Sequence, residues 1–88
     1  MKNVIVISEE NHGTIGVAVD EVAAIKFLID EGWVDDVWDK DQNKYVYHES
    51  LFEKYGVSNA LALLLEMYRE DENAFDGMFY FNKTKLFE

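Results

Sequence analysis

The sequence predicts an α+β fold in which an antiparallel β-sheet, starting with a hairpin, is packed by two main α-helices. Three observations support this prediction. Residues 4–7 and 14–19 are short runs rich in β-branched side chains, with a polar turn between them. Residues 20–33 follow directly and have the apolar spacing of an amphipathic helix. The leucine-rich residues 59–70 have the pattern of a second helix.

The first hairpin is predicted from the turn that joins its strands. Asn11 and Gly13 in this turn tolerate positive φ, which tight reversals of the chain require. The second strand alternates bulky with small side chains, so we expect one bulky face and one face that a helix can approach closely. The bulky side chains are Ile15, Val17 and Val19, and the small ones are Gly16 and Ala18.

The helix predicted within residues 20–33 has recognisable ends. The Asp20 carboxylate can accept hydrogen bonds from backbone N–H groups of the first turn. Gly32 can adopt the left-handed conformation that follows a last helical turn, and Trp33 can then fold back onto Leu28. The apolar stripe expected to face the core consists of Val22, Ile25 and Ile29, flanked by Ala24 and Leu28.

Residues 37–48 resemble a second, more exposed hairpin, and residues 50–55 a short helix. Ser58 can then cap the leucine-rich helix. From Leu61 to Tyr68 that helix is apolar over so wide a face that it needs cover on two sides. The sheet and the first helix can supply this cover, or part of the face is exposed for a partner or a homodimer.

The C-terminal residues 78–81, MFYF, have high β-propensity and are expected to form a strand inside the sheet rather than at its edge. Residues 82–85 resemble a turn before a last short extension. No proline, repeat or linker interrupts the chain, so residues 1–88 are expected to form a single compact domain. The predicted core contains Ile25, Leu28, Leu61, Leu64, Leu65, Phe79 and Phe81.

The 88 residues include 18 acidic and 8 basic side chains, for a net charge of -10. This charge disfavours nucleic acid and anionic membranes as direct partners and allows a basic protein surface, although acidity can also serve solubility alone. No run approaches the roughly 18 apolar residues of a membrane span. Because the chain also lacks cysteine and a signal-peptide pattern, we expect a soluble cytoplasmic protein.

The acidic residues are concentrated in two clusters. The first surrounds the start of the predicted second hairpin, and the second lies where the leucine-rich helix should end. We expect these carboxylates to bind a basic partner surface, and the sequence leaves open whether the two clusters share one face. The candidate partner-binding residues are Asp35, Asp36, Asp39, Asp41, Glu70, Asp71 and Glu72.

The sequence carries no signature of catalysis, and no cofactor or metal is expected. Its histidines, His12 and His48, lack the spacing of a Ser–His–Asp triad or of a metal site. The scattered glycines do not form a phosphate-binding loop. Asp39, Asp41 and Asn43 imitate the first ligands of an EF-hand loop, but the glycine and glutamate that complete such a loop are missing. A plain polar turn is therefore expected.

The segments VIVISEENHGTIGVA, AIKFLIDEGW and FYFNKTKLFE resemble small acidic proteins of unknown function that are encoded by bacteriophages of Gram-positive bacteria. The resemblance covers about the first third of the chain and its last strand. It implies an accessory protein that works in the host cytoplasm. It implies no reaction, and it transfers no catalytic or ligand residue to a position of this sequence.

The function favoured by the sequence is a non-catalytic protein-binding module that acts on a basic host protein, including one that itself binds nucleic acid. A sharper version is mimicry of nucleic acid, which requires carboxylates arrayed on one face. The alternative is a structural or homo-oligomeric component, and a small enzyme is the least favoured class because a base with positioned partners is lacking.

Overall fold

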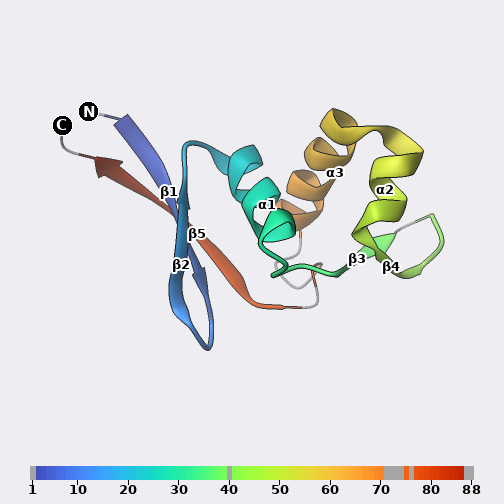
Figure 1. Ribbon diagram of the computed structural model, residues 1–88, viewed down its shortest axis with the longest axis horizontal. Coiled ribbons are helices and arrows are strands. Elements are labelled where there is room, and N and C mark those ends of the chain that lie inside the picture. The colour runs from blue at the N-terminus through green and yellow to red at the C-terminus, as the bar shows by residue number, and fades with distance from the viewer. Residues whose placement is uncertain (1, 40, 71–74, 76, 87–88) are drawn as a thin grey trace.

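The computed structural model describes residues 2–39, 41–70, 75 and 77–86. Within them the chain has the predicted α+β fold, with the three-stranded sheet at one end of the molecule and a small second hairpin toward the other (Figure 1). The strands are β1 (Lys2–Glu9), β2 (Gly13–Ala18), β3 (Asp36–Asp39), β4 (Lys44–Tyr47) and β5 (Phe79–Leu86). The helices are α1 (Glu21–Asp30), α2 (His48–Tyr55) and α3 (Val57–Glu70).

The three-stranded sheet is antiparallel and has the strand order β2-β1-β5. The predicted β1–β2 hairpin is confirmed, and Gly13 at its turn has a φ of 72°. The prediction that the last strand lies inside the sheet is wrong, because β5 forms an edge. The predicted turn at residues 82–85 is also wrong, since β5 continues through them, with Lys83 opposite Ile5 and Thr84 opposite Val4. Polar side chains in this half of β5 suit an edge that faces water.

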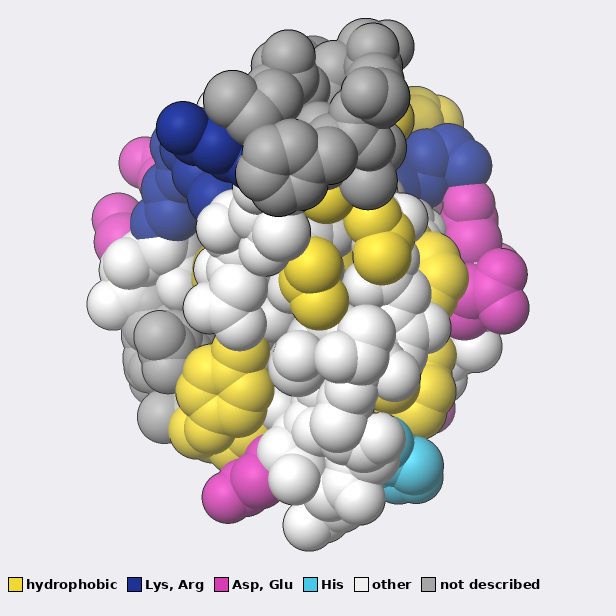
Figure 2. Space-filling model, turned by 90° about the vertical axis from the view of Figure 1, so that its left-hand side faces the viewer, with side chains coloured by type: hydrophobic (Ala, Val, Ile, Leu, Met, Phe, Trp, Pro, Cys, Tyr) yellow, Lys and Arg dark blue, Asp and Glu magenta, His cyan; other side chains and the backbone are white. Residues whose placement is uncertain are grey.

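The small face of β2, and not its bulky face, points toward the helices. A Cβ atom placed on Gly16 would lie 2.4 Å from the tip of the Phe27 ring, so this ring of α1 packs directly over the glycine and would have to shift for a larger residue. Ala18 is buried, whereas Val17 is 60% exposed. Figure 2 shows the sheet side of the molecule, where hydrophobic spots stand among backbone and uncharged atoms and carboxylates lie at the margins. Val17 of β2 and Val19 just after the strand therefore do not build the core, while Ile15 packs against it partly buried.

Both predicted ends of α1 are confirmed. The Asp20 carboxylate accepts a hydrogen bond of 2.7 Å from the backbone N–H of Ala23. At the other end Gly32 has a φ of 77°, and the N–H groups of Gly32 and Trp33 donate to the carbonyls of Ile29 and Leu28, which is a Schellman motif. The predicted stripe is shifted, because Val22 is exposed. The buried residues of α1 are Ala24, Ile25 and Leu28.

Helices α2 and α3 are separated by the single residue Gly56, which has a φ of 83°. Because α3 already begins at Val57, Ser58 lies within the helix and is not the cap that we predicted. The wide apolar face of α3 is covered by α1 and α2, so the face on which a homodimer would depend is occupied within the chain. Of the predicted core, Phe81 is partly buried and the other six residues are buried.

Candidate functional site

The predicted second hairpin is confirmed and forms a separate two-stranded sheet, β3–β4. In its register Asp36 lies opposite Tyr47, and Trp38 lies opposite Tyr45. Paired residues share a face of a sheet and neighbours along a strand alternate, so these four side chains lie on one face. The opposite face is anchored in the core by Val37, which is 0% exposed.

The outer face of this hairpin is aromatic. Tyr45 and Tyr47 are 45% and 48% exposed, and Trp38 is partly buried. The rings of Trp38 and Tyr45 meet edge to face with centroids 5.2 Å apart. Sequence reasoning did not identify these residues as functional, although the alternation of Tyr45 and Tyr47 around Val46 was a signal for exposed aromatic side chains. We call Asp35, Asp36, Trp38, Tyr45 and Tyr47 the hairpin surface.

His48, the first residue of α2, fixes the start of this surface. Its backbone N–H and its ring Nδ1 both lie 3.0 Å from the carbonyl oxygen of Asp35. A carbonyl accepts only, so Nδ1 carries the proton in this contact. His48 is 8% exposed, and its role is to hold the loop that precedes β3. As a result, the carboxylates of Asp35 and Asp36 are both exposed on a defined backbone.

Asp39 differs from its neighbours because it is 5% exposed. One carboxylate oxygen accepts a 2.9 Å hydrogen bond from the backbone N–H of Asp41, and the other accepts one of 2.8 Å from Nε2 of Gln42. Burial raises the pKa of Asp39, but these donors and the charge of Lys54 outweigh it and hold the pKa below its usual value. Asp39 therefore closes the polar turn between β3 and β4, as an Asx turn does.

Asp41 lies within this turn and is exposed. Its Oδ2 accepts a hydrogen bond of 3.1 Å from the Tyr55 hydroxyl and lies 3.4 Å from the Lys54 ammonium. These contacts connect the turn to the end of α2. In the second predicted cluster, Glu70 is exposed at the end of α3, whereas Asp71 and Glu72 lie outside the described residues.

A small hollow opens between the β3–β4 turn and helices α2 and α3, with a volume of 140 Å³. Trp38 and Tyr55 contribute aromatic rings to it, and Asp39 and Asp41 contribute carboxylates. Residues from three separate parts of the chain thus meet at one end of the hairpin surface. The apolar remainder of its lining is Leu51, Leu63 and Met67.

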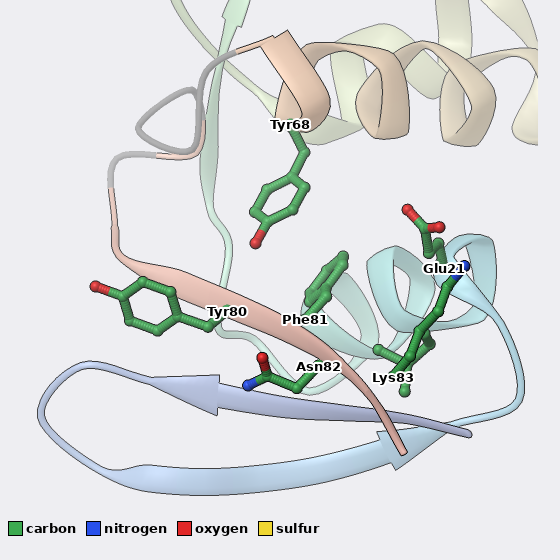
Figure 3. A pocket seen from close by; sticks show the side chains of 7 residues that line it. Glu21, Tyr68, Tyr80, Phe81, Asn82 and Lys83 are labelled. Carbon is green, nitrogen blue, oxygen red and sulfur yellow. The ribbon is translucent and has the colours of Figure 1, made fainter. Parts of the chain in front are cut away.

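A larger groove of 350 Å³ lies between β5, the first turn of α1 and the end of α3 (Figure 3). Tyr68 stacks on Phe81 with ring centroids 4.4 Å apart, and the Tyr68 hydroxyl donates to the carbonyl of Phe79 at 2.7 Å. The Glu21 carboxylate beside them is 3.2 Å from the guanidinium of Arg69. The Tyr68 hydroxyl and the Glu21 carboxylate thus each have a partner within the chain.

His12 lies at the tip of the first hairpin, where it contacts the Glu9 carboxylate. Its ring packs edge to face on the Trp33 ring, with the ring centroids 5.1 Å apart. Hydrogen bonds from His12 and from the backbone of Asn11 lower the pKa of Glu9. Among the residues that the structure describes, no three His, Asp or Glu side chains are placed to hold a metal ion.

Comparison with protein-family models, with curated proteins and with solved structures finds no match to this chain. No helix in the described ranges is both long enough and apolar enough to cross a membrane.

Proposed function

We propose that this protein is a non-catalytic protein-binding module that binds a basic surface of a host-cell protein in the cytoplasm. The observation that supports this proposal is the composition of the hairpin surface. There, the exposed carboxylate of Asp36 lies opposite the exposed ring of Tyr47, with Asp35 next to it in the chain and Tyr45 on the same face.

The two kinds of side chain have complementary effects in binding. Tyrosine and tryptophan are enriched among the residues that contribute most to protein interfaces, because they bury a large rigid area at a small entropic cost. Carboxylates, together with a net charge of -10, attract a basic partner from a distance and raise its association rate. Basic side chains also bind favourably over aromatic rings. A partner rich in lysine or arginine therefore fits this surface better than an acidic or purely apolar one.

A homo-oligomer remains the second candidate class, but the apolar face of α3 no longer favours it. Leu64 is 0% exposed and Leu61 is 7% exposed, since other helices of the same chain cover them. Nucleic-acid mimicry would need a long row of carboxylates. The hairpin surface has only two adjacent acidic residues, Asp35 and Asp36, next to its aromatic rings, which favours an ordinary protein interface.

The proposal is tested with a double variant, Asp35→Asn with Asp36→Asn, used beside the unchanged protein as bait in a bacterial lysate. A protein captured at low salt and released by a salt step is identified, and its association rate is measured with both forms. We expect the variant to associate about tenfold more slowly at low ionic strength. The difference should shrink as salt shortens the Debye length from about 10 Å at 0.1 M to about 3 Å at 1 M.

The matched control replaces two exposed carboxylates outside the hairpin surface, Glu10→Gln with Glu66→Gln. It changes the net charge by the same amount, so it should alter the association rate much less. Equal slowing by the two double variants would mean that net charge alone attracts the partner and that the hairpin surface has no special role. A captured partner whose binding ignores salt and both variants would refute the proposed function.

A further inference from the structure

We propose that the hollow between Trp38 and Tyr55 receives one lysine or arginine side chain of the partner. This inference rests on the proposed function and names the part of the partner that is recognised. The lining of the hollow is complementary to a cation on an apolar stem. Two carboxylates, two aromatic rings and an aliphatic floor line the same small space.

The size of the hollow limits its occupant to a single side chain. Its volume is 140 Å³, whereas pockets for drug-sized ligands have about 300–1,000 Å³ and a cavity of about 150 Å³ holds one benzene molecule. The floor is apolar, because Leu51 is 2% exposed, Met67 is 4% exposed and Leu63 is partly buried. Such a floor suits the methylene stem that lysine and arginine share.

The carboxylates at the hollow have capacity for another donor. The Asp39 carboxylate accepts from the backbone of Asp41 and from the side chain and backbone of Gln42, while a carboxylate can accept about four hydrogen bonds. A neutral apolar occupant would remove these oxygens from water without replacing the lost hydrogen bonds, which is unfavourable. An anion would be repelled. A cationic head group supplies both the donors and the opposite charge.

The chain itself shows how a basic side chain binds at this place. The Lys54 ammonium lies 3.4 Å from Oδ2 of Asp41 and 5.1 Å from the centre of the Tyr55 ring, so it already contacts one carboxylate and one aromatic ring of the lining. Lys54 is 47% exposed in its side chain and reaches these groups from the rim. A lysine or arginine of a partner would use the same groups and would compete with Lys54 for Asp41.

This competition provides the test. The ¹⁵N-labelled protein is titrated with the methylamides of Nα-acetyl-lysine, Nα-acetyl-arginine and, as a neutral stem of similar length, Nα-acetyl-norleucine. The indole N–H of Trp38 reports on the hollow, and that of Trp33, which lies beside His12, serves as an internal reference. We expect the two cationic probes to shift the Trp38 signal saturably, with little effect on Trp33 and a much weaker effect of norleucine.

Two variants with opposite expected effects sharpen the test. Lys54→Met removes the competing ammonium and should tighten binding of the cationic probes about two- to fivefold, the factor that an exposed ion pair is worth. Lys26→Met removes a lysine that is paired with Asp30 on α1. It makes the same change in net charge and should not tighten binding of the probes. Asp41→Asn should weaken binding about fivefold or more, because the charged acceptor is lost.

The inference is overturned if norleucine shifts Trp38 as strongly as lysine does, if Trp33 responds equally, or if Lys54→Met fails to tighten binding. The Lys54→Met result remains decisive even if Asp41→Asn disturbs the turn, because Lys54→Met leaves Asp41 in place. Failure here is separable from failure of the proposed function. If the Asp35 and Asp36 substitutions slow partner association but the cationic probes do not shift the Trp38 signal, only the hollow is refuted as the recognition site.

Discussion

At the residue scale, four aspartates that stand close together in the sequence have different environments. Asp36 and Asp39 are three positions apart on one strand, so the alternation of side chains sends them to opposite faces of the hairpin. Asp36 is exposed, and Asp39 is buried with its own donors. Asp35 and Asp36 are thus available to a partner, while Asp39 stabilises the turn and lines the hollow.

The buried carboxylate of Asp39 leads to a prediction about pH. Its pKa is lowered on folding, so below its ordinary value the unfolded chain binds more protons than the folded one. Its contribution to the free energy of unfolding is present above pH of about 4 and is lost as the pH falls below that value. Asp39→Asn should destabilise the protein by about 1–3 kcal/mol at pH 7, because a donor of Gln42 loses its acceptor.

The difference in free energy of unfolding between the Asp39→Asn variant and the unchanged protein should be smaller at pH 3 than at pH 7, as measured by urea unfolding. Asp36→Asn is the matched control, since its side chain is exposed and the free energy of unfolding should change little at either pH. An Asp39 variant as stable as the unchanged protein at pH 7 would show that the turn does not depend on the carboxylate.

At the scale of elements, α1 contains its own start and stop. The cap at Asp20 and the Schellman motif at Gly32 use only residues within or next to the helix, which is why both were predictable. The beginning of α3 was not predictable from local signals. The helix starts at the residue after Gly56, so Ser58 lies inside it and cannot precede it as a cap.

Gly32→Ala should destabilise the protein by about 1–2 kcal/mol, since a residue with a Cβ is strained in the left-handed conformation that Gly32 adopts at a φ of 77°. A Cβ at this position would meet no other atom within 4 Å, so the effect is one of backbone conformation alone. Thermal unfolding followed by circular dichroism measures it. Glu31→Ala, one residue earlier and at a φ of -89°, should change the melting temperature little.

At the scale of the whole molecule, one buried cluster joins the sheet, the helices and the β3–β4 hairpin. Ile5 and Ile7 enter it from the central strand, Leu28 from α1 and Leu64 from α3. The molecule is elongated, with extents of 44 × 27 × 22 Å, and the β3–β4 hairpin lies away from the three-stranded sheet (Figure 1). A partner at the hairpin surface therefore has no need to contact the open face of that sheet.

Leu28→Ala and Leu64→Ala should each lower the free energy of unfolding by about 2–5 kcal/mol, because both side chains are 0% exposed and their truncation leaves a cavity. Urea unfolding, followed by both tryptophan fluorescence and circular dichroism, measures the loss. Val57→Ala is the control, since this side chain is 60% exposed and its truncation should change stability by no more than about 0.5 kcal/mol. Losses below that size at both leucines would contradict the shared core.

The sequence by itself determined the elements whose signals are local. The β1–β2 hairpin follows from β-branched runs around a turn, and α1 follows from its apolar period and its two caps. The core residues of α1 and α3 were also largely predictable, because a helical period selects one face. The acidic run around Asp35 was evident as a cluster of charge.

The tertiary structure alone decided how these elements meet. It placed β5 at an edge and turned the small residues of β2 inward, because strand order and the inward face depend on partners distant in the sequence, such as Phe27 against Gly16. It separated exposed Asp36 from buried Asp39. It also brought Tyr55 of α2 to Asp41, 14 residues earlier, and so formed a hollow that no local pattern encodes.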